Sequence, residues 1–184
     1  MKKSLLLFVF AGLLQACTGQ NRELTVGDTV PNFSLKDQDD STFNMKDYVG
    51  KKILVIYFYP KDNTSGCTAE ALAFSKDAKA FAAAGAVVIG VSKDSAASHD
   101  RFKSKFDLSL TLAADEDTKT AAAYGVWVEK SMYGRRYMGM ERATFLIDGR
   151  GIIRQIWRKV KVPGHSAEVL KAAKALKTGT AAGG

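Results

Sequence analysis

The sequence is poor in the side chains that bind structural metals. Its 184 residues include only two cysteines and two histidines. A structural zinc site needs about four such ligands at short spacings, so we expect neither a metal nor a cofactor. Two cysteines are also too few for a small secreted protein that depends on a dense set of disulfides. We expect the two histidines, His99 and His165, to be structural or surface residues rather than catalytic ones.

The sequence also lacks a concentration of charge of one sign. Lys and Arg number 27 against 19 Asp and Glu, a formal net charge of +8, but the basic residues occur only in short, scattered clusters. Without a basic face or stripe, we expect a solvated surface and no nucleic-acid partner. With 46% hydrophobic and 25% charged residues, the chain has the composition of a globular protein. Its length predicts one domain, or one domain with a tail.

The chain begins with a short apolar run, Leu5–Leu14, which follows Lys2 and Lys3. A bilayer-spanning helix needs about 20 apolar residues, so this run is too short to be one. It fits the hydrophobic region of a secretory signal peptide, which we expect at 1–16. The run closes in Leu14-Gln15-Ala16-Cys17, which resembles the lipobox of bacterial lipoproteins. The alternatives are an ordinary signal peptide with a chance cysteine, or a buried N-terminal strand.

Cleavage at the lipobox would leave Cys17 as the first residue, with lipid on its sulfur. Several acyl chains hold a protein to a membrane much better than one. Thr18 follows in place of an aspartate, which by resemblance to Gram-negative lipoproteins favours the outer membrane over the inner one. We therefore expect a lipid-anchored protein of the bacterial cell envelope, facing the periplasm. Residues 17–23 would be the lipidated tether, and Cys67 would be the only free thiol.

A strand, a helix and a second strand follow one another in the first half of the chain. Ile53–Tyr59 is a nearly continuous apolar and aromatic run, which is typical of a strand buried on both faces. Cys67–Ala84 has a helical pattern that Gly85 ends, and Ala86–Ser92 is a second buried strand. This order predicts a βαβ unit with parallel strands.

Weaker patterns predict the remaining elements of an α/β fold with one mixed sheet and helices on both faces. They are a hairpin from Phe33–Leu35 and Thr42–Met45, a helix at Ser95–Phe106, a short strand at Leu110–Leu112, a short helix at Asp117–Tyr124, a hairpin from Ala143–Ile147 and Ile152–Trp157, and a helix at Ser166–Leu176. We expect the domain to span 24–176, followed by a flexible tail at 177–184.

Cys67 lies where a buried strand, a proline and a polar loop lead into a helix. A helix N-terminus offers unpaired N–H groups and the positive end of the helix dipole. Both favour the thiolate, which is the reactive form of cysteine. Thr64, three residues earlier, adds a hydroxyl that can donate or accept a hydrogen bond. By position alone, a buried and inert cysteine is an equal alternative.

The pattern Pro60-x-x-x-Thr64-x-x-Cys67 resembles the active-site motif of the peroxiredoxins. The surrounding segment FYPKDNTSGCTAEA resembles the branch called peroxiredoxin Q or bacterioferritin comigratory protein. Further similar segments follow in the same order at Gly90–Ser95, Tyr124–Trp127, Arg142–Asp148 and Val160–His165. The resemblance spans roughly 24–176. It implies a thioredoxin-like fold, thiol-dependent reduction of hydrogen peroxide and organic hydroperoxides, and a role in antioxidant defence.

The resemblance also assigns roles to individual residues. Cys67 matches the peroxidatic cysteine, whose thiolate becomes a sulfenic acid. Thr64 matches the hydroxyl that binds the peroxide, and Pro60 the residue that shields the thiolate from water. Arg142 matches the arginine that holds the thiolate and stabilises the departing oxygen. The alternative for Arg142 is a surface arginine that pairs with Glu141. Glu141 differs from the apolar residue expected there, and the sequence leaves open whether it perturbs Arg142.

The chain departs from many members of this branch at Leu72, where a second, resolving cysteine is expected. No cysteine follows Cys67, so the sequence predicts a one-cysteine enzyme. Its sulfenic acid must be reduced by an external thiol, such as thioredoxin or a glutaredoxin/glutathione system. The branch resemblance implies a monomer or a weak homodimer.

Three other functions are compatible with a thioredoxin-like fold. A membrane-tethered thiol–disulfide oxidoreductase needs Cys-x-x-Cys, but Glu70 stands in the fourth position of that motif. A metal chaperone needs Cys-x-x-x-Cys with a histidine, but Ala71 stands in the fifth position. A catalytically silent binding module would have no need of Pro60, Thr64, Cys67 and Arg142 together.

Overall fold

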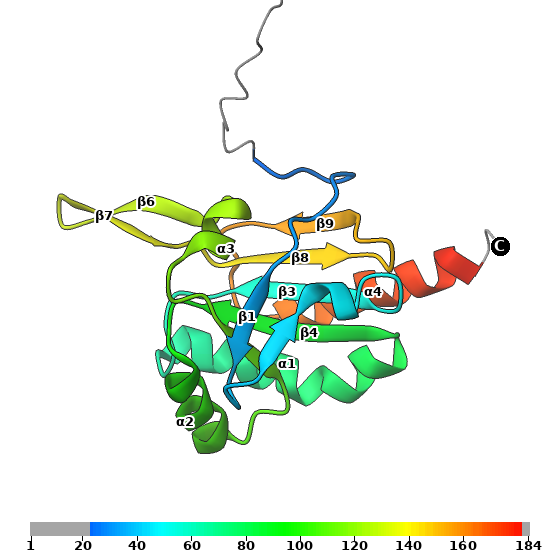
Figure 1. Cartoon of the computed structure of the whole chain (residues 1–184), viewed down its shortest axis with the longest axis horizontal. Helices are drawn as coiled ribbons and strands as arrows, with labels where there is room; N and C mark the ends of the chain where they lie inside the picture. The colour runs from blue at the N-terminus through cyan, green and yellow to red at the C-terminus, as the bar shows by residue number, and fades with distance from the viewer. Residues whose placement is uncertain (1–22, 182–184) are drawn as a thin grey trace, which may run out of the picture.

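The computed structural model describes residues 23–181. The predicted signal peptide, Cys17 and the tether up to residue 22 lie outside the described residues. The described chain forms a seven-stranded mixed sheet in the order β2-β1-β5-β4-β3-β8-β9, with a separate two-stranded sheet, β6-β7 (Figure 1). This is a thioredoxin-like α/β fold, as predicted.

The predicted βαβ unit forms the centre of the fold. Strand β3 (Ile53–Phe58) pairs in parallel with β4 (Ala86–Ser92), and α1 (Ser65–Ala83) connects them. Every residue of β3 is buried, which explains its unbroken apolar sequence. Helix α1 begins two residues before its predicted start, so Cys67 lies in its first turn.

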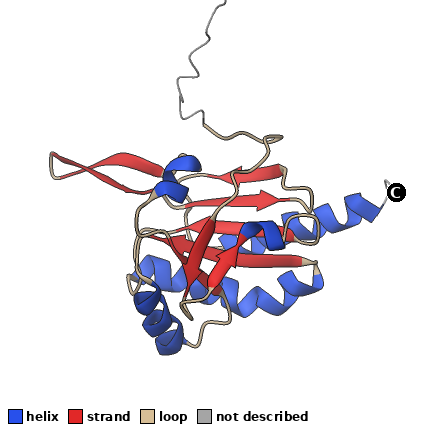
Figure 2. Ribbon diagram, in the orientation of Figure 1, coloured by secondary structure: helices blue, strands red, loops and turns tan. Residues whose placement is uncertain are grey.

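The other elements extend the sheet and cover it. Their bounds are β1 (Ser34–Asp37), β2 (Thr42–Asn44), η1 (Met45–Asp47), α2 (Ala96–Phe106), β5 (Thr111–Ala114), α3 (Lys119–Ala123), β8 (Ala143–Ile147), β9 (Ile153–Trp157) and α4 (His165–Ala181). Figure 2 shows the same arrangement by secondary structure. Strand β8 pairs antiparallel with β3, and this makes the sheet mixed.

Alternate side chains of β3 build the two sides of the core, because successive residues of a strand face opposite ways. Leu54, Ile56 and Phe58 pack on the side that includes α3. Val55 and Tyr57 pack on the side that includes α1, α2 and α4. Gly90 of β4 leaves space for the Tyr57 ring, since a Cβ at Gly90 would lie 2.6 Å from it. Helices therefore cover both faces of the sheet.

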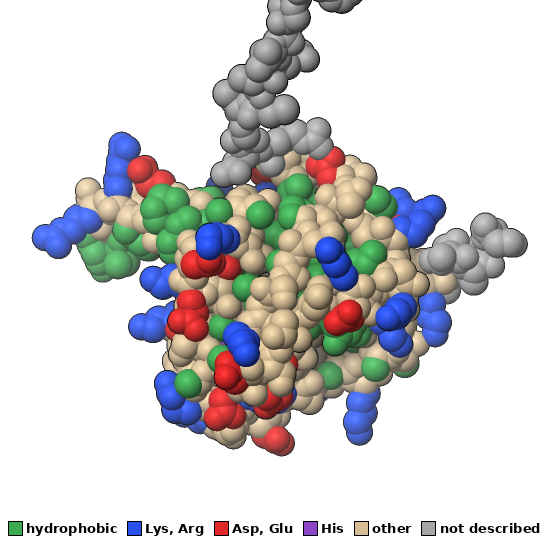
Figure 3. All heavy atoms as spheres, in the orientation of Figure 1, with side chains coloured by type: hydrophobic (Ala, Val, Ile, Leu, Met, Phe, Trp, Pro, Cys, Tyr) green, Lys and Arg blue, Asp and Glu red, His purple; other side chains and the backbone are tan. Residues whose placement is uncertain are grey.

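The sequence did not predict the hairpin of β6 (Trp127–Met132) and β7 (Arg135–Met140). It projects from the body of the protein (Figure 1), and its turn residues Tyr133 and Gly134 both have positive φ. Tyr133 is 98% exposed. Figure 3 shows hydrophobic side chains along the hairpin and basic ones at its end. A ribbon that packs little of itself into a core carries no clear alternating pattern, so periodicity could not reveal it.

The C-terminal helix was predicted too short. Helix α4 continues past Leu176 to Ala181, so the tail expected to be flexible from 177 is helical in this part. Two contacts lie where the extension begins. Leu176 packs against the core, and Lys177 donates a hydrogen bond from Nζ to the Ala83 carbonyl at 2.7 Å. The helix is thus held at the point where composition alone would let it fray.

Candidate active site

Cys67 lies at the start of α1, close to the end of β3. Its side chain is 1% exposed and packs among the apolar residues on the α1 side of the core. Thr64 is the N-cap residue, but its side chain makes no capping hydrogen bond. The first N–H groups of a helix have no partner within the helix. The sulfur therefore sits in an apolar environment at the positive end of the helix.

Arg142 reaches this sulfur from the start of β8, the strand next to β3. It directly precedes β8, and the register pairs Ala143 of β8 with Phe58 at the end of β3. Arg142 therefore lies beside the loop that leads to α1, and its Nη2 donates to the Cys67 Sγ at 3.3 Å. The guanidinium passes close to the backbone of the helix start, since a Cβ at Gly66 would lie 3.4 Å from Nη2.

Glu70 is the second partner of Arg142, and sequence reasoning did not identify it. Its carboxylate forms an ion pair with Nη1, and its side chain is 1% exposed. Burial raises the pKa of Glu70 to about 7, although Arg142 acts to lower it. Residues three apart share one helix face, so the spacing from Cys67 to Glu70 was a usable signal.

Glu141 does not compete for Arg142. Its carboxylate pairs with Arg158 at 3.4 Å, and Arg158 also binds Glu23 at 3.0 Å. Arg142 instead contacts Glu70 through Nη1 and Cys67 through Nη2. The structure thus answers a question that the sequence left open.

Thr64 and Pro60 lie on the loop before α1. The Thr64 hydroxyl donates to the Lys61 carbonyl at 3.1 Å, and its oxygen lone pairs can still accept a hydrogen bond. Pro60 lines a cavity of about 430 Å³ together with Arg142. The fold thus brings all four predicted site residues to one end of β3.

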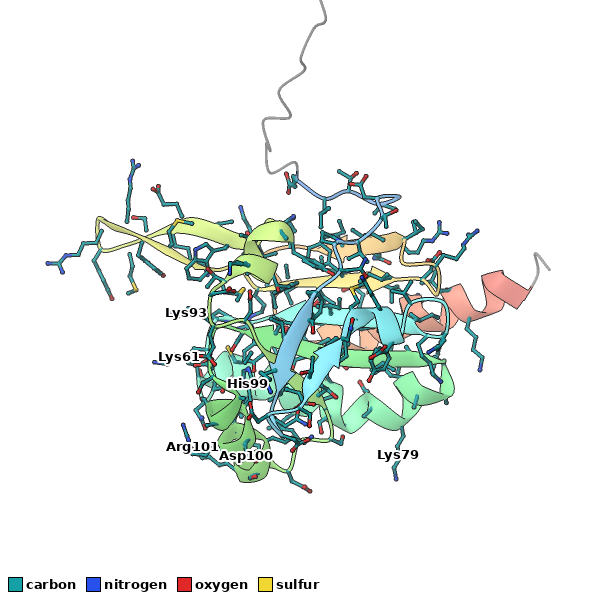
Figure 4. All side chains as sticks on the ribbon, viewed as in Figure 1. Lys61, Lys79, Lys93, His99, Asp100 and Arg101 are labelled. Carbon is teal, nitrogen blue, oxygen red and sulfur yellow. The ribbon has the colours of Figure 1, made fainter. Side chains whose placement is uncertain are left out.

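A buried polar network holds Asp62, in the middle of this loop. Asp62 accepts hydrogen bonds from Tyr59 at 2.8 Å and Ser98 at 2.8 Å, and its carboxylate lies 3.0 Å from Nδ1 of His99. Burial opposes ionisation of Asp62, but the contact with His99 and the hydrogen bonds from Ser98 and Tyr59 outweigh it, so its pKa is lowered. In Figure 4, His99 lies inward of Lys61, on the side of the protein that includes α2.

Both histidines, predicted to be structural or surface residues, are buried. His99 is fully buried and contacts Asp62, while His165 is buried and lies 2.8 Å from the Thr144 hydroxyl. Within residues 23–181, no group of three or more His, Cys, Asp and Glu side chains is arranged to hold a metal ion.

Comparison with known proteins identifies the family. Residues 26–156 match the model of the AhpC/TSA family. The chain belongs to this family. The putative peroxiredoxin bcp of Coxiella burnetii is 46% identical over 147 residues, which cover 80% of this chain and 97% of the relative. Peroxiredoxin Bcp of Bacillus subtilis is 46% identical over 151 residues, covering 82% and 96%. The chain is a peroxiredoxin of the Bcp or PrxQ type.

Solved structures agree with this placement. The bacterioferritin comigratory protein of Xanthomonas campestris, studied for its alkyl peroxide reduction activity, is 43% identical with a TM-score of 0.75. The alignment covers 79% of this chain and 92% of that one. A PrxQ variant from Xylella fastidiosa is 41% identical with a TM-score of 0.79, covering 83% and 97%. The predicted thioredoxin-like fold and thiol peroxidase activity are therefore confirmed.

Proposed function

We propose that Cys67 is the peroxidatic residue of this peroxiredoxin. The observation that carries the proposal is the 3.3 Å contact between Arg142 Nη2 and a buried sulfur in the first turn of α1. The Cys67 thiolate attacks the terminal oxygen of a hydroperoxide, and the O–O bond breaks. The sulfur is oxidised to sulfenic acid, and the leaving oxygen takes up a proton and departs as water or an alcohol.

The neighbouring groups have distinct tasks in this reaction. Arg142 holds the thiolate and donates to the oxygens as negative charge moves onto the leaving one. The Thr64 hydroxyl and the backbone N–H of Cys67 orient the peroxide. Pro60 limits access of water to the sulfur. Glu70 fixes the guanidinium from its far side, so that Nη2 faces the sulfur.

This task for Glu70 predicts a pH dependence. Its pKa of about 7 lies above the ordinary value of 4.5, so Glu70 is protonated below pH 7 and ionised above it. The ion pair with Arg142 forms only in the ionised state, so the rate of Cys67 oxidation should rise through pH 7. In Glu70→Gln the rise of the rate near pH 7 should vanish, and above pH 7 the oxidation rate should be about tenfold lower than in the wild type. Stopped-flow oxidation at several pH values measures it.

The exposed Glu116→Gln serves as the control for that experiment and should keep the wild-type pH profile. A change of rate with pH that arises from ionisation of the thiol itself should persist in Glu70→Gln. An unchanged profile in Glu70→Gln would show that Glu70 does not position Arg142.

We further propose a one-cysteine mechanism. The resolving position of many relatives is occupied by Leu72, which is 43% exposed on α1. An external thiol, from thioredoxin or a glutaredoxin/glutathione system, must then attack the sulfenic acid, release water and form a mixed disulfide that a second thiol cleaves.

The proposed mechanism predicts the product of a single oxidation. The full chain with Cys17→Ser has Cys67 as its only cysteine. After one equivalent of peroxide, intact-mass analysis should show one added oxygen, which a sulfenate-specific trap captures. Excess peroxide should then add a second oxygen and give the sulfinic acid. A disulfide-linked dimer as the main product would contradict the proposal.

We also propose that Cys17 carries lipid and anchors the protein to the outer membrane, facing the periplasm. The support is the signal-like segment and the lipobox resemblance at Leu14–Cys17. Among the helices of residues 23–181, none is both long and apolar enough to cross a bilayer. In a Gram-negative host, the full chain should partition into detergent, and Cys17→Ala should release it into the aqueous phase. A wild-type protein that stays aqueous after processing would refute the anchor.

A further inference from the structure

A cavity lies directly beside the proposed reaction centre. Its volume of about 430 Å³ suits a small organic molecule. Pro60 and Arg142 form part of its wall, and Arg142 also contacts the sulfur. Val128 of β6 and Val160 supply apolar wall, and Lys130 and Lys159 supply positive charge. The cavity therefore combines apolar surface with cations next to a reactive thiol.

Cationic side chains outnumber carboxylates in the lining of the cavity. The cations are Lys130, Arg142 and Lys159, and the carboxylates are Glu129 and Glu141. Each carboxylate pairs with an arginine that does not line the cavity: Glu141 with Arg158 at 3.4 Å, and Glu129 with Arg136 at 3.3 Å. In the described part of the chain, neither cavity lysine takes part in an ion pair. A positive excess beside apolar walls favours a ligand that has a negative group and a hydrocarbon part.

Lys130 is held in position for such a ligand. Its ammonium donates to the Met140 carbonyl, which leaves two of its three hydrogen-bond donors available. Its stem lies over Gly139, where a Cβ would come within 3.2 Å of the Lys130 Cδ. Burial lowers the pKa of Lys130, while the nearby charges of Glu141 and Cys67 raise it and Arg142 lowers it.

Lys159 is placed by the backbone of the catalytic region. The N–H of Val160 donates to the Arg142 carbonyl at 3.0 Å, which ties this segment to the strand end that carries the arginine. Lys159 itself has a φ of +48°, so the chain turns sharply at this residue. The exposed lysine and the half-buried Lys130 therefore line the same cavity from two separate segments.

We propose that this cavity is a carboxylate-binding subsite, in which Lys130 and Lys159 hold the acidic group of a reactant whose other end meets Cys67. The proposal rests on the proposed function of Cys67. Two reactants share this chemistry: an organic hydroperoxide that carries a carboxylate, which oxidises Cys67, and a small thiol that carries a carboxylate, which reduces the sulfenic acid. In both cases the subsite increases the rate by orienting the reactant.

The oxidation reaction is tested with cumene hydroperoxide and its para-carboxylate derivative. The full chain carrying Cys17→Ser is mixed with each peroxide, and the rate of Cys67 oxidation is followed by stopped flow. The quantity compared is the ratio of the carboxylate rate to the neutral rate. Lys130→Met or Lys159→Met should lower this ratio about tenfold, since each removes a charge-assisted contact. Lys79→Met makes the same charge change near the other end of α1 (Figure 4) and should leave the ratio intact.

The reduction reaction is tested with 3-mercaptopropionate and 2-mercaptoethanol, which differ in the carboxylate. Each thiol is added to the sulfenic form of the same variants, and rates are compared per thiolate. If the lysine variants lower the ratio of the carboxylate rate to the neutral rate only with the peroxides, the subsite binds the hydroperoxide. If they lower this ratio only with the thiols, the subsite binds the reductant. Unchanged ratios in both reactions would overturn the proposal. If neither peroxide oxidises Cys67 at all, it is the proposed function that fails.

Discussion

Cys67→Ser is expected to lose peroxide reduction entirely while retaining the wild-type fold. A serine hydroxyl ionises far less readily than a thiol, and oxygen does not form the sulfenic acid on which the cycle depends. The side chain is 1% exposed and closely packed, and a hydroxyl is nearly isosteric with a thiol. We therefore expect a free energy of unfolding within about 1 kcal/mol of wild type. Peroxide consumption with a thiol donor, together with thermal unfolding, measures both quantities.

Cys17→Ser is the matched control, because it makes the same replacement at the other cysteine. It should retain full turnover when protein is assayed in detergent. Residual turnover in Cys67→Ser above the level without protein would mean that another group reacts with the peroxide. In that case the assignment of Cys67 would be wrong.

Arg142→Met is expected to reduce kcat/KM for peroxide by about 10²–10³, the usual effect of losing one preorganised donor. Methionine keeps much of the side-chain bulk but removes both contacts, the one to the Cys67 sulfur and the ion pair with Glu70. Burial raises the pKa of Glu70, and Arg142 lowers it. Without the guanidinium only burial acts, so the pKa should rise further and the carboxyl should become neutral. Neutralisation limits the loss of folding stability.

Arg142→Lys separates charge from geometry. A lysine keeps one positive charge but lacks the planar fork that lets Arg142 contact Glu70 and Cys67 at once. We expect it to recover only part of the lost rate. The exposed Arg150→Met removes a charge at the opposite end of β8 and should have the wild-type rate. A kcat/KM for Arg142→Met within a factor of two of wild type would show that the observed contact does not contribute to catalysis.

The centre of the fold was predictable because local patterns determine it. The unbroken apolar sequence of Ile53–Tyr59 and the helical pattern that ends at Gly85 are properties of neighbouring residues. The projecting hairpin and the end of α4 were not predictable in this way. The first buries little apolar surface, and the second depends on Lys177 reaching Ala83, 94 residues away.

The candidate site likewise contains a part that contiguous sequence predicts and a part that depends on contacts between distant residues. The loop and helix start that contain Thr64 and Cys67 were evident from the sequence, because they are contiguous. Arg142 was identified by resemblance, but its partner depends on which residues the β3–β8 register brings together. For that reason the sequence left open whether the adjacent acid, Glu141, competes for Arg142, and Glu70 was missed.

The backbone segments that carry Arg142 and Cys67 differ in how strongly they are hydrogen-bonded. Arg142 precedes a strand that is hydrogen-bonded on both sides, to β3 and to β9. Cys67 lies in a helical turn whose N-cap side chain makes no capping bond. In hydrogen-exchange terms, the amides of β8 should open only with global unfolding, whereas those at the start of α1 should open by local fraying. In the proposed mechanism, a reductant then meets the oxidised sulfur when the first turn opens, while the arginine stays in place for the next peroxide.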